Sequence, residues 1–132
     1  MKKLRISILF LFLTNITLCQ IVITGKVVRI TDGDTITLLD ENNKQVKIRL
    51  YGIDCPEKHQ DFGSVAKQFT ADKCFNKRIK VEIKYTDRYR RKVGTVILPN
   101  GKNLNKELLK AGLAWHYAMF DSSTELSMIE KK

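Results

Sequence analysis

Residues that could bind a phosphate or hold a metal cation gather in one short stretch of this 132-residue chain. Residues 48–57 have the sequence IRLYGIDCPE, which places Arg49 within an apolar strand and Asp54 and Glu57 on either side of Pro56. An arginine in such a strand is costly unless its guanidinium meets an anion or lines a cleft. Carboxylates at the end of a strand suit a hard cation with oxygen ligands, calcium before zinc. The alternative is an Arg–Asp ion pair accompanied by solvated acids.

Two further charged segments flank this stretch. Residues 32–35, DGDT, carry two carboxylates at a turn, and a hairpin with capping aspartates is the simpler explanation of this tetrapeptide taken alone. Residues 87–92, DRYRRK, are strongly basic, and a solvated surface charge run is the alternative for Arg88 and Arg90. The chain has 24 Lys and Arg against 14 Asp and Glu, a formal net charge of +10. A field of this sign concentrates phosphates, so a polyanion is a candidate partner.

Alternating apolar residues and turn signals indicate the elements that must position these groups. Strands are expected at 21–30, 35–39, 46–50, 79–85 and 93–98 because these segments are β-branched or alternate with period two. Residues 61–75 change to helical spacing, with Phe62, Val65, Ala66 and Phe69 on one face. A second helix is expected at 104–111, between Asn103 as N-cap and Gly112 as its end.

This order of elements predicts the fold class. Three strands, a helix, two strands and a helix make an α+β, mainly β protein, and a five-stranded OB-fold barrel with two to three helices accommodates them. A third helix should begin in the tail from Asp121, with Ser122 as a possible cap, and should be short. One domain, residues 20–132, is expected because the chain is too short for a second core. OB domains bind oligonucleotides, but a fold does not decide function.

The first 19 residues are expected to be a signal peptide and not part of the fold. A positive region at 2–5 precedes an apolar run at 6–18 that is too short for a membrane span. Thr17 and Cys19 have the spacing of a signal-peptidase site, so cleavage after Cys19 would give a secreted or periplasmic protein without stable membrane insertion. A lipoprotein with lipidated Cys19 is less favoured because Leu18 precedes the cysteine, and an uncleaved anchor is the remaining alternative.

Export would leave Cys55 and Cys74 in an oxidising compartment, where they could form a disulfide. The sequence does not decide whether these two thiols meet. No CxxC spacing is present, so a zinc site built on cysteines is disfavoured.

Five segments, taken in order, resemble the staphylococcal nuclease, or thermonuclease, family over residues 21–120. They are DGDT (32–35), IRLYGIDCPE (48–57), FGSVAKQF (62–69), DRYRRKVG (87–94) and NLNKELLKAGLAW (103–115). The resemblance implies an OB barrel with three helices. The chain departs from the family pattern at Arg90, where many relatives have glycine, so a strained turn that displaces Arg91 is expected to be a risk.

The resemblance also implies site residues at matching positions. Asp34 and Asp54 match carboxylate ligands of a calcium ion, and Cys55 matches a ligand through its main-chain carbonyl. Arg49 and Arg91 match the two arginines that clamp the scissile phosphate. Glu57 matches the carboxylate that orients or deprotonates the attacking water.

Substrate contacts are implied around these catalytic positions. Tyr89 matches a tyrosine near the nucleotide phosphate, and Arg88 lies beside it. Tyr117 or Phe120 is expected to stack on a base. Trp115 is expected in the core, and the family does not use a residue at the position of His116.

The function expected from the resemblance is a secreted, calcium-dependent endonuclease that acts as a monomer. Such an enzyme cleaves DNA and RNA with little sequence specificity and leaves 3′-phosphate ends. The alternative is a catalytically silent OB-fold module that binds nucleic acid, although such modules lose the acids and arginines that are all present here.

Overall fold

The computed structural model describes residues 18–119 and 121–131. Residues 1–17 of the expected signal peptide lie outside the described residues, as does Phe120. Within the described part of the chain, no helix is long and apolar enough to cross a membrane.

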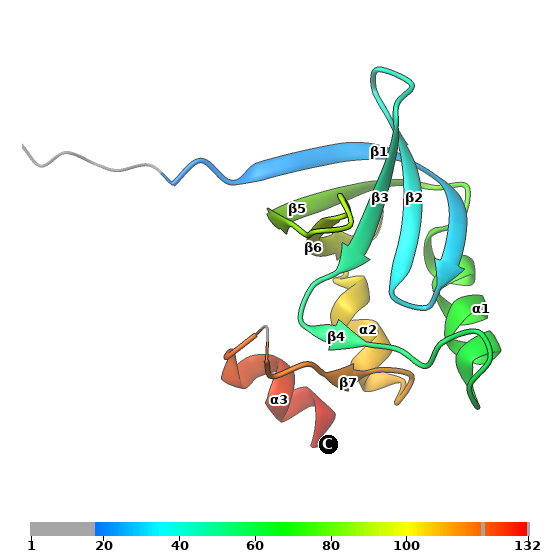
Figure 1. Ribbon diagram of the computed structural model, residues 1–132, viewed down its shortest axis with the longest axis vertical. Helices are drawn as coiled ribbons and strands as arrows, with labels where there is room; N and C mark the ends of the chain where they lie inside the picture. Colours follow the sequence, from blue (N-terminus) through cyan, green and yellow to red (C-terminus); the bar gives the residue numbers. More distant parts are fainter. Residues whose placement is uncertain (1–17, 120, 132) are drawn as a thin grey trace, which may run out of the picture.

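Five strands close into a barrel, which confirms the expected OB-like α+β fold (Figure 1). Neighbouring strands pair antiparallel except β3 and β6, which run parallel. The order around the barrel is β1-β2-β3-β6-β5, with bounds β1 Ile21–Asp32, β2 Thr35–Asp40, β3 Gln45–Leu50, β5 Arg78–Thr86 and β6 Lys92–Ile97.

The barrel interior is filled by every second residue of the strands, because successive side chains of a strand point to opposite faces. Ile36 and Leu38 of β2, Ile48 and Leu50 of β3 and Val96 of β6 are almost fully buried. The intervening residues of β3, including Lys47 and Arg49, therefore project from the outer face of the barrel.

Two helices, α1 Gly63–Cys74 and α2 Leu104–Lys110, pack on the barrel, and α3 Thr124–Glu130 packs against α2 and the short strand β7 (Trp115–His116). The expected cap of α2 is confirmed, since the Asn103 side chain accepts a hydrogen bond from the Lys106 N–H at 3.2 Å. The expected cap of α3 is wrong by one residue. Ser123 occupies the N-cap, and its own N–H donates to the Asp121 carboxylate at 3.1 Å. Within the described residues, the first turn of α3 therefore has no side-chain cap, and Asp121 instead binds the residue at the N-cap position.

The buried face of α1 differs from the expected one. Phe62 and Val65 are 69% and 49% exposed, whereas Ala66 is buried as expected, together with Gly63, Thr70 and Cys74. Small side chains lie inside because α1 packs against the turn between β1 and β2: a Cβ on Gly33 would come within 2.8 Å of the Ala66 Cβ. A close approach of two backbones thus overrides the apolar spacing.

A second, two-stranded sheet was not predicted from the sequence. β4 (Ile53–Asp54) pairs antiparallel with β7 (Trp115–His116). Trp115 is 46% exposed, so its expected place in the core is wrong, whereas only 6% of the His116 side chain is exposed. Pairing with β4 fixes the alternation of this short strand and turns the histidine inward.

Candidate active site

Asp34 is held at the turn between β1 and β2 by close packing beneath it. Gly33 and Asp34 connect the paired residues Asp32 and Thr35. The Gly33 carbonyl accepts a hydrogen bond from the Thr70 hydroxyl of α1 at 2.6 Å. A Cβ on Gly33 would lie 3.0 Å from the Cys55 sulfur, so only glycine lets the turn press this closely on its neighbours. The result is an aspartate that is 5% exposed and fixed in position.

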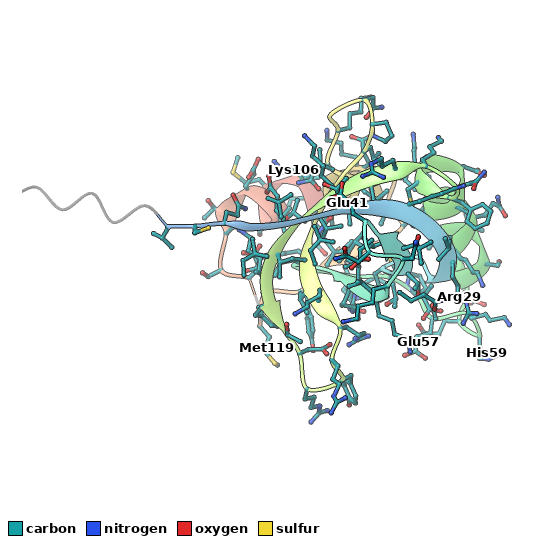
Figure 2. The ribbon with its side chains drawn as sticks, turned by 90° about the horizontal axis from the view of Figure 1, so that it is seen from above. Arg29, Glu41, Glu57, His59, Lys106 and Met119 are labelled. Atoms are coloured by element: carbon teal, nitrogen blue, oxygen red, sulfur yellow. The ribbon has the colours of Figure 1, made fainter. Side chains whose placement is uncertain are left out.

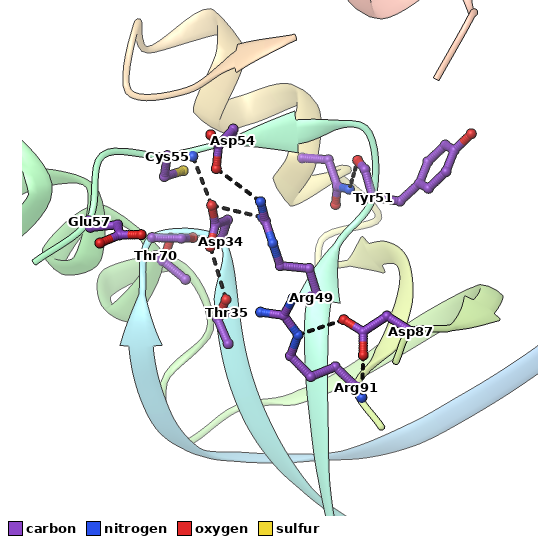
Figure 3. Close-up of polar contacts among 12 residues, drawn as sticks. Asp34, Thr35, Arg49, Tyr51, Asp54, Cys55, Glu57, Thr70, Asp87 and Arg91 are labelled. Carbon is purple, nitrogen blue, oxygen red and sulfur yellow. Dashed lines mark hydrogen bonds and ion pairs between the residues drawn. The ribbon is translucent and has the colours of Figure 1, made fainter. Parts of the chain in front are cut away.

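Asp34 is bound from three directions. Its Oδ2 accepts the Cys55 backbone N–H at 2.8 Å and lies 2.7 Å from Nη1 of Arg49. Its Oδ1 accepts the Thr35 hydroxyl at 2.9 Å. Figure 3 shows these contacts converging on one carboxylate. The turn at residues 32–35, for which an ordinary hairpin was the simpler explanation, therefore carries a buried and fixed carboxylate, that of Asp34.

Arg49 bridges two acids. Its Nη1 lies 2.7 Å from Asp34 Oδ2 and its Nη2 lies 3.0 Å from Asp54 Oδ1 (Figure 3). Only 15% of the arginine side chain is exposed. Burial raises the pKa of Asp54, Arg49 counteracts this rise, and the negative charge of Asp34 adds to it. The two carboxylates thus repel one another across a gap that the guanidinium currently fills.

The acid pair fits a hard cation that keeps most of its own water. Within residues 18–119 and 121–131, no group of three acidic, histidine or cysteine side chains is placed to hold a metal. Asp34 and Asp54 supply oxygen ligands only, and two repelling carboxylates are neutralised by a divalent charge. Further ligands would be main-chain oxygens, water or a substrate phosphate.

The Cys55 thiol takes no part in this donor set. Cys55 and Cys74 are both free and buried, so the possible disulfide is not formed. Burial raises the pKa of Cys55 well above that of an ordinary thiol and raises the pKa of Cys74 to about 12. A hard cation prefers oxygen to sulfur, so the main-chain carbonyl is the group of Cys55 that suits it.

Glu57 lies in the loop between β4 and α1. Its backbone is held by contacts, whereas its side chain is not. Its N–H donates to the Gln60 side chain at 2.7 Å, and a Cβ on Gly63 would lie 1.9 Å from the Glu57 carbonyl oxygen. Within the described residues, its carboxylate makes no hydrogen bond or ion pair, and Figures 2 and 3 show it at the edge of the molecule, outside the dashed network. The structure therefore does not bring Glu57 into contact with Asp34, Asp54 or Arg49.

The loop between β5 and β6 is built around Asp87. Its Oδ1 accepts the backbone N–H groups of Tyr89 and Arg91, each at 2.9 Å, and its Oδ2 lies 2.7 Å from Nε of Arg91. Burial opposes ionisation of this acid, but the hydrogen bonds from Arg91 outweigh it and hold the pKa of Asp87 below its usual value. An aspartate that accepts hydrogen bonds from residues two and four positions ahead is a common local turn pattern, but no role was predicted for Asp87 from the sequence.

Arg90 adopts the strained backbone that was expected at this position. Its φ is 62°, in the left-handed region that glycine tolerates and other residues avoid. The strain does not displace Arg91, because the contacts to Asp87 hold the Arg91 guanidinium in place.

Replacing Arg90 with glycine is expected to stabilise the protein by about 1 kcal/mol, since left-handed strain of about 1–2 kcal/mol outweighs the unfolded-state entropy of glycine. Urea unfolding of the variant measures this difference. Arg88→Gly in the same loop is the matched control and should destabilise, because Arg88 is absent from the residues with positive φ. A loss of stability in Arg90→Gly would contradict the strain.

A cavity of about 600 Å³ brings together Arg49 and Arg91, the two arginines expected to clamp a phosphate. Arg49 reaches it from β3 and Arg91 from the loop between β5 and β6. Its lining combines aromatic rings with apolar side chains: the other lining residues are Leu50, Gly52, Ile53, Tyr85, Thr86, Asp87, Arg88, Tyr89, Val93 and Tyr117. The expected substrate-binding residues Arg88, Tyr89 and Tyr117 are all among them. This combination suits a ligand with a phosphate and a flat ring.

Tyr85 was missed by the sequence analysis. It lies near the end of β5, is 40% exposed, and packs edge-on against Tyr51 with ring centroids 6.4 Å apart. The signal in the sequence was a large aromatic residue next to a basic loop. It was not recognised as a site residue because the alternation of the strand already accounted for its position.

Tyr89 is surrounded by cations. The guanidinium carbons of Arg88 and Arg91 lie 4.8 Å and 5.4 Å from its ring centroid, and Arg88 also donates to the Tyr89 hydroxyl at 2.8 Å. Stacking of this kind holds both guanidiniums on the ring. Arg88 is thus more than part of a solvated charge run.

Tyr117 is held at the cavity by its backbone, which donates to the Gly52 carbonyl at 2.9 Å. The segment that follows is anchored by Asp121, which is 6% exposed. The Asp121 carboxylate accepts hydrogen bonds from the Ser123 hydroxyl at 2.5 Å and lies 3.2 Å from Nε2 of His116. Burial opposes ionisation of Asp121, but Ser123 and His116 outweigh it, so its pKa is below the usual value.

Asp121→Asn is expected to lower the free energy of unfolding by about 1–3 kcal/mol near neutral pH. Because the folded pKa of Asp121 is depressed, its contribution is present above the ordinary carboxyl pKa of about 3.9 and is lost as the pH falls through the folded value. Urea unfolding across this range should therefore show the two proteins converging in acid. Ser122→Ala, at the exposed neighbouring position, should match the parent protein at every pH, and a constant gap for Asp121→Asn would contradict the linkage.

The fold and the site together define a class. A closed OB-like barrel presents two guanidiniums and three tyrosines around one cavity, beside an acid pair suited to a hard cation. These are the groups that a protein needs to act on the phosphodiester bonds of nucleic acids.

Comparison with known proteins agrees with this class. Residues 47–132 match the family model described as "Staphylococcal nuclease homologue". An uncharacterized endonuclease of Haemophilus influenzae is 38% identical over 120 residues, which is 90% of this chain and 67% of that protein. The chain therefore belongs to the staphylococcal nuclease family, which makes it a nuclease, a hydrolase of phosphodiester bonds.

Two further relatives have similar identity. An uncharacterized endonuclease of Escherichia coli O157:H7 is 36% identical over 132 residues, all of this chain and 84% of the relative. A micrococcal nuclease of Shigella flexneri is 40% identical over 114 residues, covering 80% of this chain and 65% of the relative.

Proposed function

We propose that the protein is a calcium-dependent endonuclease that cleaves DNA and RNA with little sequence specificity and leaves 3′-phosphate ends. The observation that carries this proposal is the placement of Arg49 and Arg91 on one cavity, with Asp34 and Asp54 directly behind Arg49. The names of the similar proteins, two endonucleases and a micrococcal nuclease, support it.

The two arginines neutralise the charge that develops on the phosphate. Attack on a phosphodiester increases the charge on its non-bridging oxygens, and planar guanidiniums can bind these oxygens bidentately. Asp87 orients Arg91 through the contact between its Oδ2 and Nε, which leaves the two terminal nitrogens free to face the ligand. Arg49 reaches the same phosphate once its hold on Asp34 and Asp54 is relaxed.

Asp34, Asp54 and the main-chain carbonyl of Cys55 would hold the calcium ion. When bound, the ion offsets negative charge on the diester and on the acid pair. Asp34 is the orientated ligand, because Thr35 and the Cys55 N–H fix both of its oxygens. Asp54 is the more adaptable ligand, since 39% of its side chain is exposed.

Glu57 is proposed to take the proton from the attacking water. Its carboxylate has no competing partner among the described residues, and its backbone is fixed by Gln60 and by the close approach of Gly63. A general base must come within about 3 Å of the water, directly or through a second water. The exposed loop position leaves the side chain free to reach that distance.

Low sequence specificity follows from the lining of the cavity. Tyr85, Tyr89 and Tyr117 offer ring faces, on which any base can stack. The arginines address phosphate, which carries no sequence information.

We also propose that the protein is exported as a monomer after cleavage behind Cys19. The positive region at 2–5 and the apolar run at 6–18 support this proposal. Mass spectrometry of protein collected from outside the cytoplasm should find Gln20 as the first residue. An intact Met1, or a lipid mass on Cys19, would contradict it.

The nuclease proposal is tested by digesting plasmid DNA and RNA with the parent protein in calcium, with the parent protein in chelator, and with the Asp54→Asn variant in calcium. Cleavage should require calcium, produce 3′-phosphate ends that block extension by a polymerase until a phosphatase is added, and fall sharply in the variant. Cleavage that persists in chelator would overturn the metal dependence. Binding of nucleic acid without cleavage under all conditions would favour the silent OB module.

A further inference from the structure

Lys47 lies beside the cavity but has no role in the site described above. It is two residues before Arg49 on β3, and Ile48 between them is buried in the barrel, so both basic side chains project from the same outer face. The two positions are about 6.6 Å apart along the strand. Lys47 therefore precedes Arg49 by two positions on the same outer face of β3.

A second hollow, of about 270 Å³, is lined by Lys47, Tyr89 and Arg91. Tyr89 and Arg91 also line the larger cavity, so these two side chains form a wall shared by both spaces. A ligand that occupies the larger cavity and continues past Arg91 would enter the hollow at Lys47.

Lys47 itself has no acidic partner among the described residues, unlike the two arginines near it. Arg49 and Arg91 have acidic partners, but within the described part of the chain Lys47 makes no ion pair or hydrogen bond through its side chain. Its neighbour on β2 is Thr37, and the residue beyond, opposite Thr37 on β1, is Arg29. Arg29 likewise has no acidic partner among the described residues, and Figure 2 shows it on the outer edge of the barrel. This row across three strands repels cations and attracts an anion.

We propose that Lys47, with Arg91 and Tyr89, forms a second phosphate-binding subsite that takes the backbone phosphate next to the scissile one in a nucleic acid strand. The proposal rests on the nuclease function proposed above. According to this proposal, Lys47 contributes to the binding of polynucleotides but not to the binding of a ligand that has a single phosphate.

Binding in chelator tests the subsite independently of cleavage. The parent protein and Lys47→Ala are titrated with fluorescent oligothymidylate at several salt concentrations. Lys47→Ala should weaken binding by up to about fivefold, the upper end of the range for one exposed ion pair. The slope of log affinity against log salt should fall by about 0.7, the value for one lost phosphate contact on a single strand.

Two further variants control this measurement. Lys80→Ala removes an exposed lysine from β5, away from the hollow, and should reproduce the parent protein. Lys47→Arg keeps the charge and should restore both the affinity and the slope. An unchanged slope in Lys47→Ala, or an equal loss in Lys80→Ala, would overturn the subsite.

Cleavage with calcium then separates the subsite from the nuclease function. Lys47→Ala should raise KM for oligothymidylate and leave the cleavage of thymidylyl-thymidine, which has a single phosphate, unchanged. An equal effect on both substrates would place Lys47 at the scissile phosphate and overturn the proposal. If the parent protein binds with the expected slope change but cleaves neither substrate, the subsite stands and the nuclease function fails.

Discussion

Replacing Arg49 with lysine is expected to lower kcat/KM for DNA cleavage by roughly 10²- to 10³-fold, the range for losing one preorganised donor to a developing anion. Lysine keeps the positive charge but loses the planar fork that binds two phosphate oxygens at once. The geometry sharpens this expectation, because Arg49 uses separate nitrogens for Asp34 and Asp54 and a single ammonium cannot reproduce both contacts.

The Arg49→Lys variant should still fold. A lysine ammonium at this position continues to offset the charge of the buried Asp34, whereas an alanine would leave a buried carboxylate unpaired at a cost of about 3–5 kcal/mol. Thermal melts should therefore separate the lysine variant from the alanine variant in the metal-free protein. Arg78→Lys is the matched control, since Arg78 pairs with Glu41 on the exposed surface and should change neither rate nor stability. Full activity in Arg49→Lys would remove Arg49 from the phosphate clamp.

Replacing Glu57 with glutamine is expected to lower kcat by roughly 10²- to 10⁴-fold, the range for losing a general base. Calcium affinity should change little, because the Glu57 carboxylate makes no contact with Asp34 or Asp54 in the described structure. The measurements are single-turnover cleavage at saturating calcium and calorimetric titration of the metal.

Asp61→Asn is the control for Glu57→Gln, because it removes an exposed acid from the same loop. It should retain the parent rate. A Glu57→Gln variant that loses calcium binding together with activity would make Glu57 a metal ligand, and one that keeps its rate would exclude it as the base.

Much of the barrel could be predicted because strands, caps and turns depend on residues that are close together in the sequence. Strands β2 and β3 have apolar residues at every second position, and Asn103 and Gly112 mark the ends of α2 through their own backbone preferences. The positive φ of Arg90 was likewise expected from a single position. The residue types at Arg49, Asp54 and Glu57 were sufficient to nominate a phosphate and metal site, whereas Asp34 and Arg91 were assigned only through the resemblance to the family.

Other features depend on what an element packs against. Phe62 and Val65 have the spacing of a buried helical face, but α1 buries Ala66 and Thr70 because Gly33 approaches it too closely for large side chains. Trp115 is the larger and more apolar neighbour of His116, yet pairing with β4 exposes the tryptophan and buries the histidine beside Asp121.

The sequence by itself determined the barrel strands, the helices and the charged residues available for chemistry, because strand alternation, caps and turns act between residues a few positions apart. Only the tertiary structure decided how those charges are paired. Arg49 lies between Asp34 and Asp54 because β2 pairs with β3 at Thr35 and Arg49, and because the Cys55 N–H binds Asp34; Lys47 meets Arg91 because β3 pairs with β6. Such distances depend on long-range strand pairing, which no local pattern specifies.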